Sequence, residues 1–127
     1  MSHKIYLAAS WKERDRAREI CELLEKENII QTEDWWNHTG KSASEYAYLD
    51  KEAIQQAEIY VMLNATPVSG GKYTEFGMAI QRNIPIFVFG TRMKIVFKDF
   101  VTEHIDETEP EKIRDWIVKY FEERKNG

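Results

Sequence analysis

The sequence predicts one α/β domain in which a mostly parallel sheet of about five strands carries helices on both faces. Three observations support this fold class. Strand-like and helix-like segments alternate along the chain, the expected strands are continuous apolar runs, and each expected helix has one apolar face. Continuous apolar strands are typical of parallel sheets that are covered on both sides. The length of 127 residues suits a single core, so we expect residues 1–127 to form one domain.

The N-terminal half is predicted to contain two strand–helix pairs. Residues 3–10, HKIYLAAS, form an apolar strand that ends on small residues, and Ser10 is a candidate N-cap for a helix over 11–28. That helix has an apolar stripe at positions i, i+3, i+4 and i+7, which consists of Ala17, Ile20, Cys21 and Leu24. A short strand within 28–36 and a polar loop lead to a second helix over 44–57, whose inner face includes Ala53 and Ile54.

The C-terminal half continues the same alternation. The predicted elements are a strand over 58–65, a loop over 66–71, a helix over 73–83, a strand over 84–90 that ends at Gly90, a loop with a short helical turn over 91–100, an edge strand over 101–105 and a helix over 109–127. Pro110 lies in the first turn of the last helix, a position that proline tolerates. Phe76 and Ala79 mark the apolar side of the third helix, and Ile113 and Ile117 mark that of the last.

Composition excludes several classes of protein. Cys21 is the single cysteine, so no intrachain disulfide forms, and together with the lack of a signal-like N-terminus this indicates a cytoplasmic location. No apolar run approaches the roughly 20 residues that span a membrane. The net charge of −4 argues against a general nucleic-acid binder. We expect no metal site, because the three histidines and Cys21 show no ligand spacing.

Glu75 is the first candidate catalytic residue. Parallel α/β sheets bind ligands beyond the carboxyl ends of their strands, and the start of the third helix lies at that edge. Either the Glu75 carboxylate only stabilises the helix N-terminus, by about 0.3–1 kcal/mol, or the helix dipole keeps it ionised as a nucleophile for a sugar carbon. In the second interpretation, Gly70 and Gly71 let a ligand approach the backbone.

Asp50 and Tyr6 are the other catalytic candidates. Asp50 lies one turn after Tyr46 on the second helix, with Ala53 and Ile54 at i+3 and i+4, so it is either a solvated flank residue or a partly buried acid that exchanges protons. Two carboxyl groups in different environments are the usual pair for cleaving a glycosidic bond. Tyr6, near the end of the first strand, is either a core residue or a hydroxyl that orients Glu75.

The loops at this edge contain further candidates for ligand binding. Of Trp35 and Trp36, we expect one to pack in the core and the other, taken as Trp36, to stack on a flat ring such as a nucleobase. His38 is either a ligand contact or an exposed loop residue. Lys72 ends the stretch SGGK and either meets a phosphate or is solvated, since this stretch lacks the spacing of a phosphate-binding GxxxxGK[ST] loop.

Three stretches together resemble the nucleoside 2-deoxyribosyltransferase superfamily: KIYLAAS, YLDKEAIQQAEIYVML and SGGKYTEFGMAIQRNIPIFVFG, which span most of residues 4–90. The resemblance implies a three-layer flavodoxin-like fold, cleavage of the N-glycosidic bond of a 2′-deoxynucleoside or its monophosphate, and no cofactor. It also implies that Glu75, in EFGMA, is the nucleophile, that Asp50 contacts the base and assists its protonation, and that Tyr6 holds the nucleophile. The implied substrate-binding residues are Ala8, Ser10, Trp11, Trp36, Ser69, Gly70, Gly71, Lys72 and Met78.

The chain departs from the superfamily in the loop before the nucleophile. Ser69 replaces an acidic residue found in many members, and Gly71-Lys72 stands where the superfamily has Gly-Thr. Two functions therefore stay open: an enzyme that passes the sugar to another base or to water, and a nucleotide sensor without turnover. The expected partner is a small nucleoside or nucleotide. We also expect a homo-oligomer, with Tyr48 or Phe97 at an interface.

Overall fold

The computed structural model describes residues 2–37, 39–65, 70–92 and 98–126, and it confirms the predicted fold class. Five strands form one sheet: β1 (His3–Ala8), β2 (Ile29–Gln31), β3 (Ile59–Asn64), β4 (Ile86–Gly90) and β5 (Glu103–Ile105). All neighbouring strands are parallel, in the order β2-β1-β3-β4-β5. This is the strand order of flavodoxin-like doubly wound sheets.

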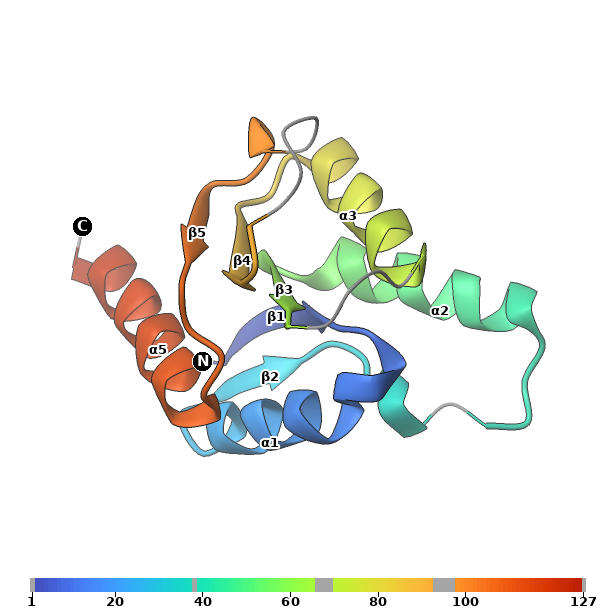
Figure 1. Ribbon diagram of the computed structural model, residues 1–127, viewed down its shortest axis with the longest axis horizontal. Helices are drawn as coiled ribbons and strands as arrows, with labels where there is room; N and C mark the ends of the chain where they lie inside the picture. The colour runs from blue at the N-terminus through green and yellow to red at the C-terminus, as the bar shows by residue number, and fades with distance from the viewer. Residues whose placement is uncertain (1, 38, 66–69, 93–97, 127) are drawn as a thin grey trace.

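Helices cover both faces of the sheet (Figure 1). α1 (Arg14–Glu25) and α5 (Pro110–Asn126) lie on one face, and α2 (Ala43–Gln56) and α3 (Gly70–Arg82) lie on the other. Successive side chains of a strand point to opposite faces. Ile5 and Leu7 of β1 therefore pack with α1 and α5, whereas Tyr6 and Ala8 pack with α2 and α3.

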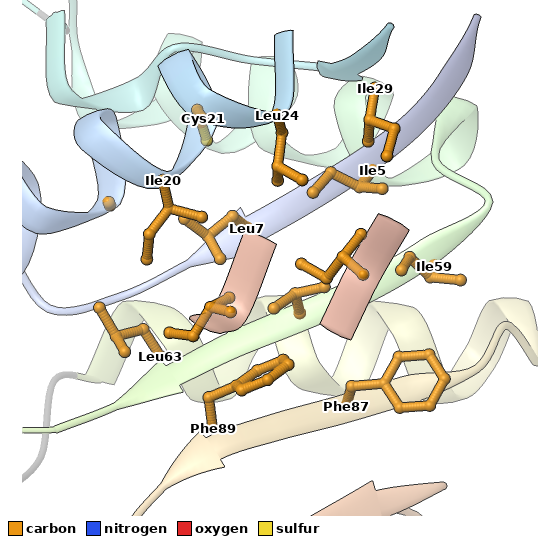
Figure 2. Packing of buried hydrophobic residues seen from close by; sticks show 14 of the residues in the cluster. Ile5, Leu7, Ile20, Cys21, Leu24, Ile29, Ile59, Leu63, Phe87 and Phe89 are labelled. Atoms are coloured by element: carbon orange, nitrogen blue, oxygen red, sulfur yellow. The ribbon is translucent and has the colours of Figure 1, made fainter. Parts of the chain in front are cut away.

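The face covered by α1 and α5 carries an aliphatic and aromatic core. Figure 2 shows Ile20, Cys21 and Leu24 of α1 on the side of β1, in one apolar layer that continues through side chains of β3 and β4. Phe87 and Phe89 of β4 continue this layer towards α5, where rings meet edge to face. The apolar stripes predicted for the first and last helices are the surfaces that this core buries.

Arg82 fastens α3 to α2 on the opposite face. Its guanidinium donates hydrogen bonds to the carbonyl oxygens of Ile54 and Ala57, at 2.9 and 2.7 Å. These carbonyls belong to the last turn of α2, whose C-terminal oxygens have no partner within the helix. The contact fixes the position of α2 relative to α3, the two helices that carry Asp50 and Glu75.

The helix starts differ from the sequence prediction. Trp11–Glu13 forms a 3₁₀ turn, η1, ahead of α1, and Ser10 makes no side-chain capping bond to it. Ser42 does cap α2, in a reciprocal capping box with Glu45.

The start of α3 also differs from the prediction. α3 begins at Gly70 rather than at residue 73, so Glu75 lies in its second turn. The influence of the helix dipole is confined to the first turn, so the prediction that the dipole acts on Glu75 is wrong.

Two other predictions bear on the remaining segments. The turn expected within 91–100 falls mostly on residues 93–97, which lie outside the described part of the chain. The predicted edge strand is present as β5. Among the described residues, none of the helices combines the length and apolar character needed to cross a membrane.

Candidate active site

A cluster of acids and tyrosines lies between the sheet and the α2–α3 layer. We call it the acid cluster, and it consists of Tyr6, Glu33, Asp50, Tyr60 and Glu75. The Tyr6 hydroxyl donates a hydrogen bond to Oε2 of Glu75. The rings of Tyr6 and Tyr60 lie nearly parallel, with centroids 6.0 Å apart. The contact between Tyr6 and Glu75 that the sequence predicts is therefore present.

Register and helix periodicity bring these side chains together. Tyr6 and Tyr60 are directly paired across β1 and β3, so both point towards α2 and α3. Phe76 and Ala79 bury one side of α3 against the same face, and Glu75 precedes Phe76 at its edge. Asp50 lies on the side of α2 that buries Ala53 and Ile54, one turn further on.

Burial dominates the ionisation of Glu75. Burial raises the pKa of Glu75 above its ordinary value of 4.5, the Tyr6 hydrogen bond lowers it and the charge of Asp50 raises it, so that the pKa of Glu75 is about 8. The prediction of a carboxylate kept ionised by its helix is therefore wrong for the ligand-free protein. Burial and the Glu75 charge also raise the pKa of Tyr6, so its hydroxyl stays protonated and serves as a donor.

Glu33 is a member of the cluster that sequence reasoning missed. It follows β2 by two residues, and burial raises its pKa to about 9, with a hydrogen bond to Asp50 as the second cause. Both of its carboxyl oxygens and Oδ1 of Asp50 are shielded from solvent. A usable signal was available, because β2 ends at the same sheet edge as β1 and β3, and ligands bind at that edge.

The two tryptophans after β2 pack against different parts of the core. Trp36 packs on the α1 side and borders a hollow that Arg18 and Cys21 also line. It therefore lies on the opposite side of the sheet from the acid cluster, and the expectation that it stacks on a bound base is wrong. Trp35 packs against the core on both faces of the sheet, and its indole nitrogen donates to the Leu7 carbonyl at 2.7 Å.

The loop after β1 lies where the sequence predicts. Ala8 and Ser10 are buried at the carboxyl end of β1, whereas Trp11 is 53% exposed. The guanidinium of Arg14 lies over the Trp11 ring, 4.7 Å from its centroid. Their predicted contacts with a substrate stay predictions.

The remaining predicted contacts divide between α3 and undescribed residues. Gly70 and Gly71 are the first two residues of α3. Ser69, His38 and the side chain of Lys72 lie outside the described part of the chain. Met78 lines a groove of about 540 Å³ between α2 and α3, to which neither Glu75 nor Asp50 contributes. Among the described residues, no three histidine, cysteine or acidic side chains are arranged to hold a metal ion.

Comparison with protein-family models gives no match, and no curated protein matches the chain. Among solved structures, the Clostridium botulinum CMP N-glycosidase BcmB is 18% identical, with a TM-score of 0.72 over 90% of this chain and 97% of that one. BlsM is 17% identical, with a TM-score of 0.70 over 92% and 88%. The RPS4–RRS1 TIR domain heterodimer matches at 10% identity and a TM-score of 0.58, over 97% of both chains.

At such identities the likeness establishes a shared backbone arrangement, and the side chains of the site have to be interpreted individually. The chain therefore has a flavodoxin-like α/β fold, which it shares with the CMP N-glycosidase BcmB and with BlsM.

Proposed function

We propose that this protein cleaves the N-glycosidic bond of a nucleoside or nucleotide, with a 2′-deoxynucleoside or its monophosphate as the expected substrate. The observation that carries the proposal is the hydrogen bond from Tyr6 to Glu75 beside Asp50, whose charge raises the pKa of Glu75. Two carboxyl groups in one buried cluster match the chemistry of glycosidic cleavage. The N-glycosidase activity in the name of BcmB supports the same class of reaction.

The proposed reaction has two steps. A Glu75 carboxylate oxygen attacks C1′ of the sugar, while the electron pair of the C1′–N bond leaves with the base and Asp50 assists protonation of that base. The resulting glycosyl ester on Glu75 is then attacked by water or by a second base, which restores the carboxylate. Tyr6 orients Glu75 and stabilises its ionised form through the hydrogen bond.

The raised pKa values of the cluster define the form that reacts. Glu75 attacks only when it is ionised, above its pKa of about 8. Glu33, with a pKa of about 9, still holds its proton there and keeps one acidic hydrogen beside Asp50. We therefore expect kcat/KM to rise with pH through the lower value and to fall through the higher one, because this ratio reports ionisation of the free enzyme.

The test is a substrate panel followed by chromatography. Deoxynucleosides, deoxynucleoside monophosphates and CMP are each incubated with the protein, with and without a free acceptor base. Release of base without acceptor indicates a hydrolase, and a new nucleoside formed only with acceptor indicates a transferase. Absence of both products across the panel would contradict an enzymatic role.

Two variants separate the chemistry from the fold. Glu75→Gln is expected to lower turnover by at least about a thousandfold, because it removes the nucleophile. Glu19→Gln makes the same change at an exposed position of α1 and should leave turnover unchanged. Mass spectrometry of the quenched wild-type reaction is expected to find the sugar on the peptide that contains Glu75. Full activity of Glu75→Gln would overturn the mechanism.

The second candidate function is a nucleotide sensor without turnover. One observation favours it: with a pKa of about 8, Glu75 is mostly protonated at pH 7 and then serves better as a hydrogen-bond partner than as a nucleophile. Isothermal titration with the same panel distinguishes the candidates, since a sensor binds a member of the panel without releasing base. The predicted homo-oligomer stays a prediction, which light scattering after size exclusion tests directly.

A further inference from the structure

Glu33 and Asp50 form a buried pair of acids that the attack on the sugar does not itself require. Glu33 comes from the loop after β2 and Asp50 from α2, so the pair bridges two elements that are far apart in the sequence. Their shielded oxygens have little access to water. Two carboxyl groups in hydrogen-bonding contact cannot both be ionised at low cost, so the pair retains one proton.

The backbone around Glu33 is held firmly against β1. The Gln31 side chain accepts a hydrogen bond from the Leu7 amide at 2.7 Å and donates to the Leu7 carbonyl at 3.2 Å. It also donates to the Glu33 carbonyl oxygen at 2.9 Å. On the other side of Glu33, the Trp35 indole donates to the Leu7 carbonyl. These contacts hold the Glu33 backbone beside β1, and the charge of Glu33 is one of the causes that raise the pKa of Tyr6.

The charged and titratable groups that act on Glu33 come from every element around it. They are Asp50 on α2, Glu75 on α3, Asp34 in the same loop and Tyr6 on β1. The three carboxylates all disfavour ionisation of Glu33, as does its burial. Asp34 differs from the others because it is exposed and accepts a hydrogen bond from Asn37 at 3.0 Å.

We propose that Glu33 is a positioning residue for Asp50, and that this pair stores the proton that Asp50 delivers to the departing base. The inference rests on the proposed function. As the C1′–N bond breaks, its electron pair passes to the base and the stored proton moves from Asp50 to a base nitrogen. When water or a new base attacks the glycosyl ester, the proton that the attacking molecule loses returns to the pair, so charge and atoms balance over one turnover.

The proposal predicts a dependence on the leaving group. Glu33→Gln keeps a hydrogen-bond donor for Asp50 but removes the transferable proton. We expect kcat on a nucleotide substrate to fall by about a hundredfold or more. The same variant should retain its rate on a 4-nitrophenyl glycoside of the same sugar, because nitrophenolate leaves without protonation. Glu33→Asp, which keeps a carboxyl group, should recover part of the loss, and Glu19→Gln, at an exposed position of α1, should affect neither substrate.

Infrared spectroscopy tests the stored proton without any substrate. In the wild-type protein, we expect two protonated-carboxyl components, one from Glu75 that disappears near pH 8 and one from Glu33 that disappears near pH 9. Glu33→Gln should remove only the Glu33 component, and Asp50→Asn should lower the midpoint of that component, since Asp50 raises the pKa of Glu33. Circular dichroism and thermal melting verify that each variant is folded.

The possible outcomes separate the two proposals. Absence of the Glu33 component, or its persistence in Glu33→Gln, would overturn the stored proton whatever the protein catalyses. Equal losses on the nucleotide and the nitrophenyl glycoside would assign Glu33 a purely structural role. A band that titrates as expected, in a protein that cleaves neither substrate, would support the pair and contradict the proposed function.

Discussion

The two faces of the sheet bury side chains of different character. The face under α1 and α5 is packed with aliphatic and aromatic residues, and Phe87 of β4 lies with its ring centroid 4.7 Å from that of Trp116. The face under α2 and α3 buries Tyr6 and Tyr60 next to the carboxyl group of Glu75. Successive side chains of a strand point to opposite faces of the sheet, so neighbouring residues of one strand belong to these two different environments.

This difference indicates where the protein gains stability and where it gives some up. Burying apolar surface contributes roughly 25 cal/mol per Å², whereas burying carboxyl groups together disfavours their ionisation. Apolar packing on both faces therefore stabilises the fold, whereas the α2–α3 face also carries carboxyl groups whose ionisation opposes folding. Shifted ionisation of buried acids that lie close together is typical of catalytic and binding sites.

The largest expected effect comes from a substitution in the core under α1 and α5. Phe89 is fully buried there, so Phe89→Ala should lower the free energy of unfolding by about 3–5 kcal/mol through lost burial and a residual cavity. Phe100, which is 53% exposed, offers the matched control, and Phe100→Ala should change stability by less than about 0.5 kcal/mol. Urea denaturation measures both, and equal losses would contradict the contribution of Phe89 to the buried core.

The next effect concerns the pH dependence of stability that arises from the acid cluster. The folded pKa values of Glu75 and Glu33, about 8 and about 9, exceed the ordinary value of 4.5. Above pH 4.5 the unfolded chain has released these protons and the folded chain still binds them, so stability falls as pH rises and levels off above about pH 9. The double variant Glu33→Gln, Glu75→Gln should remove a loss on the order of a few kcal/mol.

Urea denaturation between pH 5 and pH 9.5 provides that measurement. The stability of the double variant should exceed that of the wild type more at alkaline than at acid pH. If the difference in stability between the two proteins were independent of pH, Glu33 and Glu75 would not titrate as described.

A smaller effect is expected from removing the hydrogen bond between Tyr6 and Glu75 in the acid cluster. That bond lowers the pKa of Glu75, so Tyr6→Phe should move the rising limb of the pH–rate profile to higher pH. We expect kcat/KM at pH 7 to fall by about 10- to 100-fold, the usual value of a hydrogen bond to a charged group. Tyr48→Phe changes a residue that is 63% exposed and should have no effect. An unshifted profile in Tyr6→Phe would exclude this role of the hydroxyl.

The smallest expected effects on stability come from substitutions at two glycines. Gly90 has a φ of 102°, and an added Cβ would lie 2.8 Å from the Asn64 carbonyl oxygen, so Gly90→Ala should be destabilising by about 1–3 kcal/mol. Gly77 lies inside α3 with open space around it, and Gly77→Ala should be stabilising by about 0.4–1 kcal/mol. Thermal melting measures both, and a destabilising Gly77→Ala would indicate that this surface of α3 is covered by something in solution.

Local sequence patterns predicted some parts of the site and missed others. The contact of Tyr6 with Glu75 was predictable because each residue lies at a regular position of a strongly patterned element. Glu33 was missed because β2 is only three residues long and its loop has no periodicity. The assignment of Trp36 failed for a similar reason, since two adjacent tryptophans in a loop give no sign of which side of the sheet each one takes.

By itself, the sequence determined the order of strands and helices, the parallel sheet and the residues that face inwards, because apolar periodicity is a local property of the chain. Only the tertiary structure decided that Glu33 joins Asp50 and that burial, rather than the helix dipole, controls Glu75. The free energy of ionising a carboxyl group depends on the solvent and charges within a few ångströms. Those surroundings come from segments that are distant in sequence, so no local pattern specifies them.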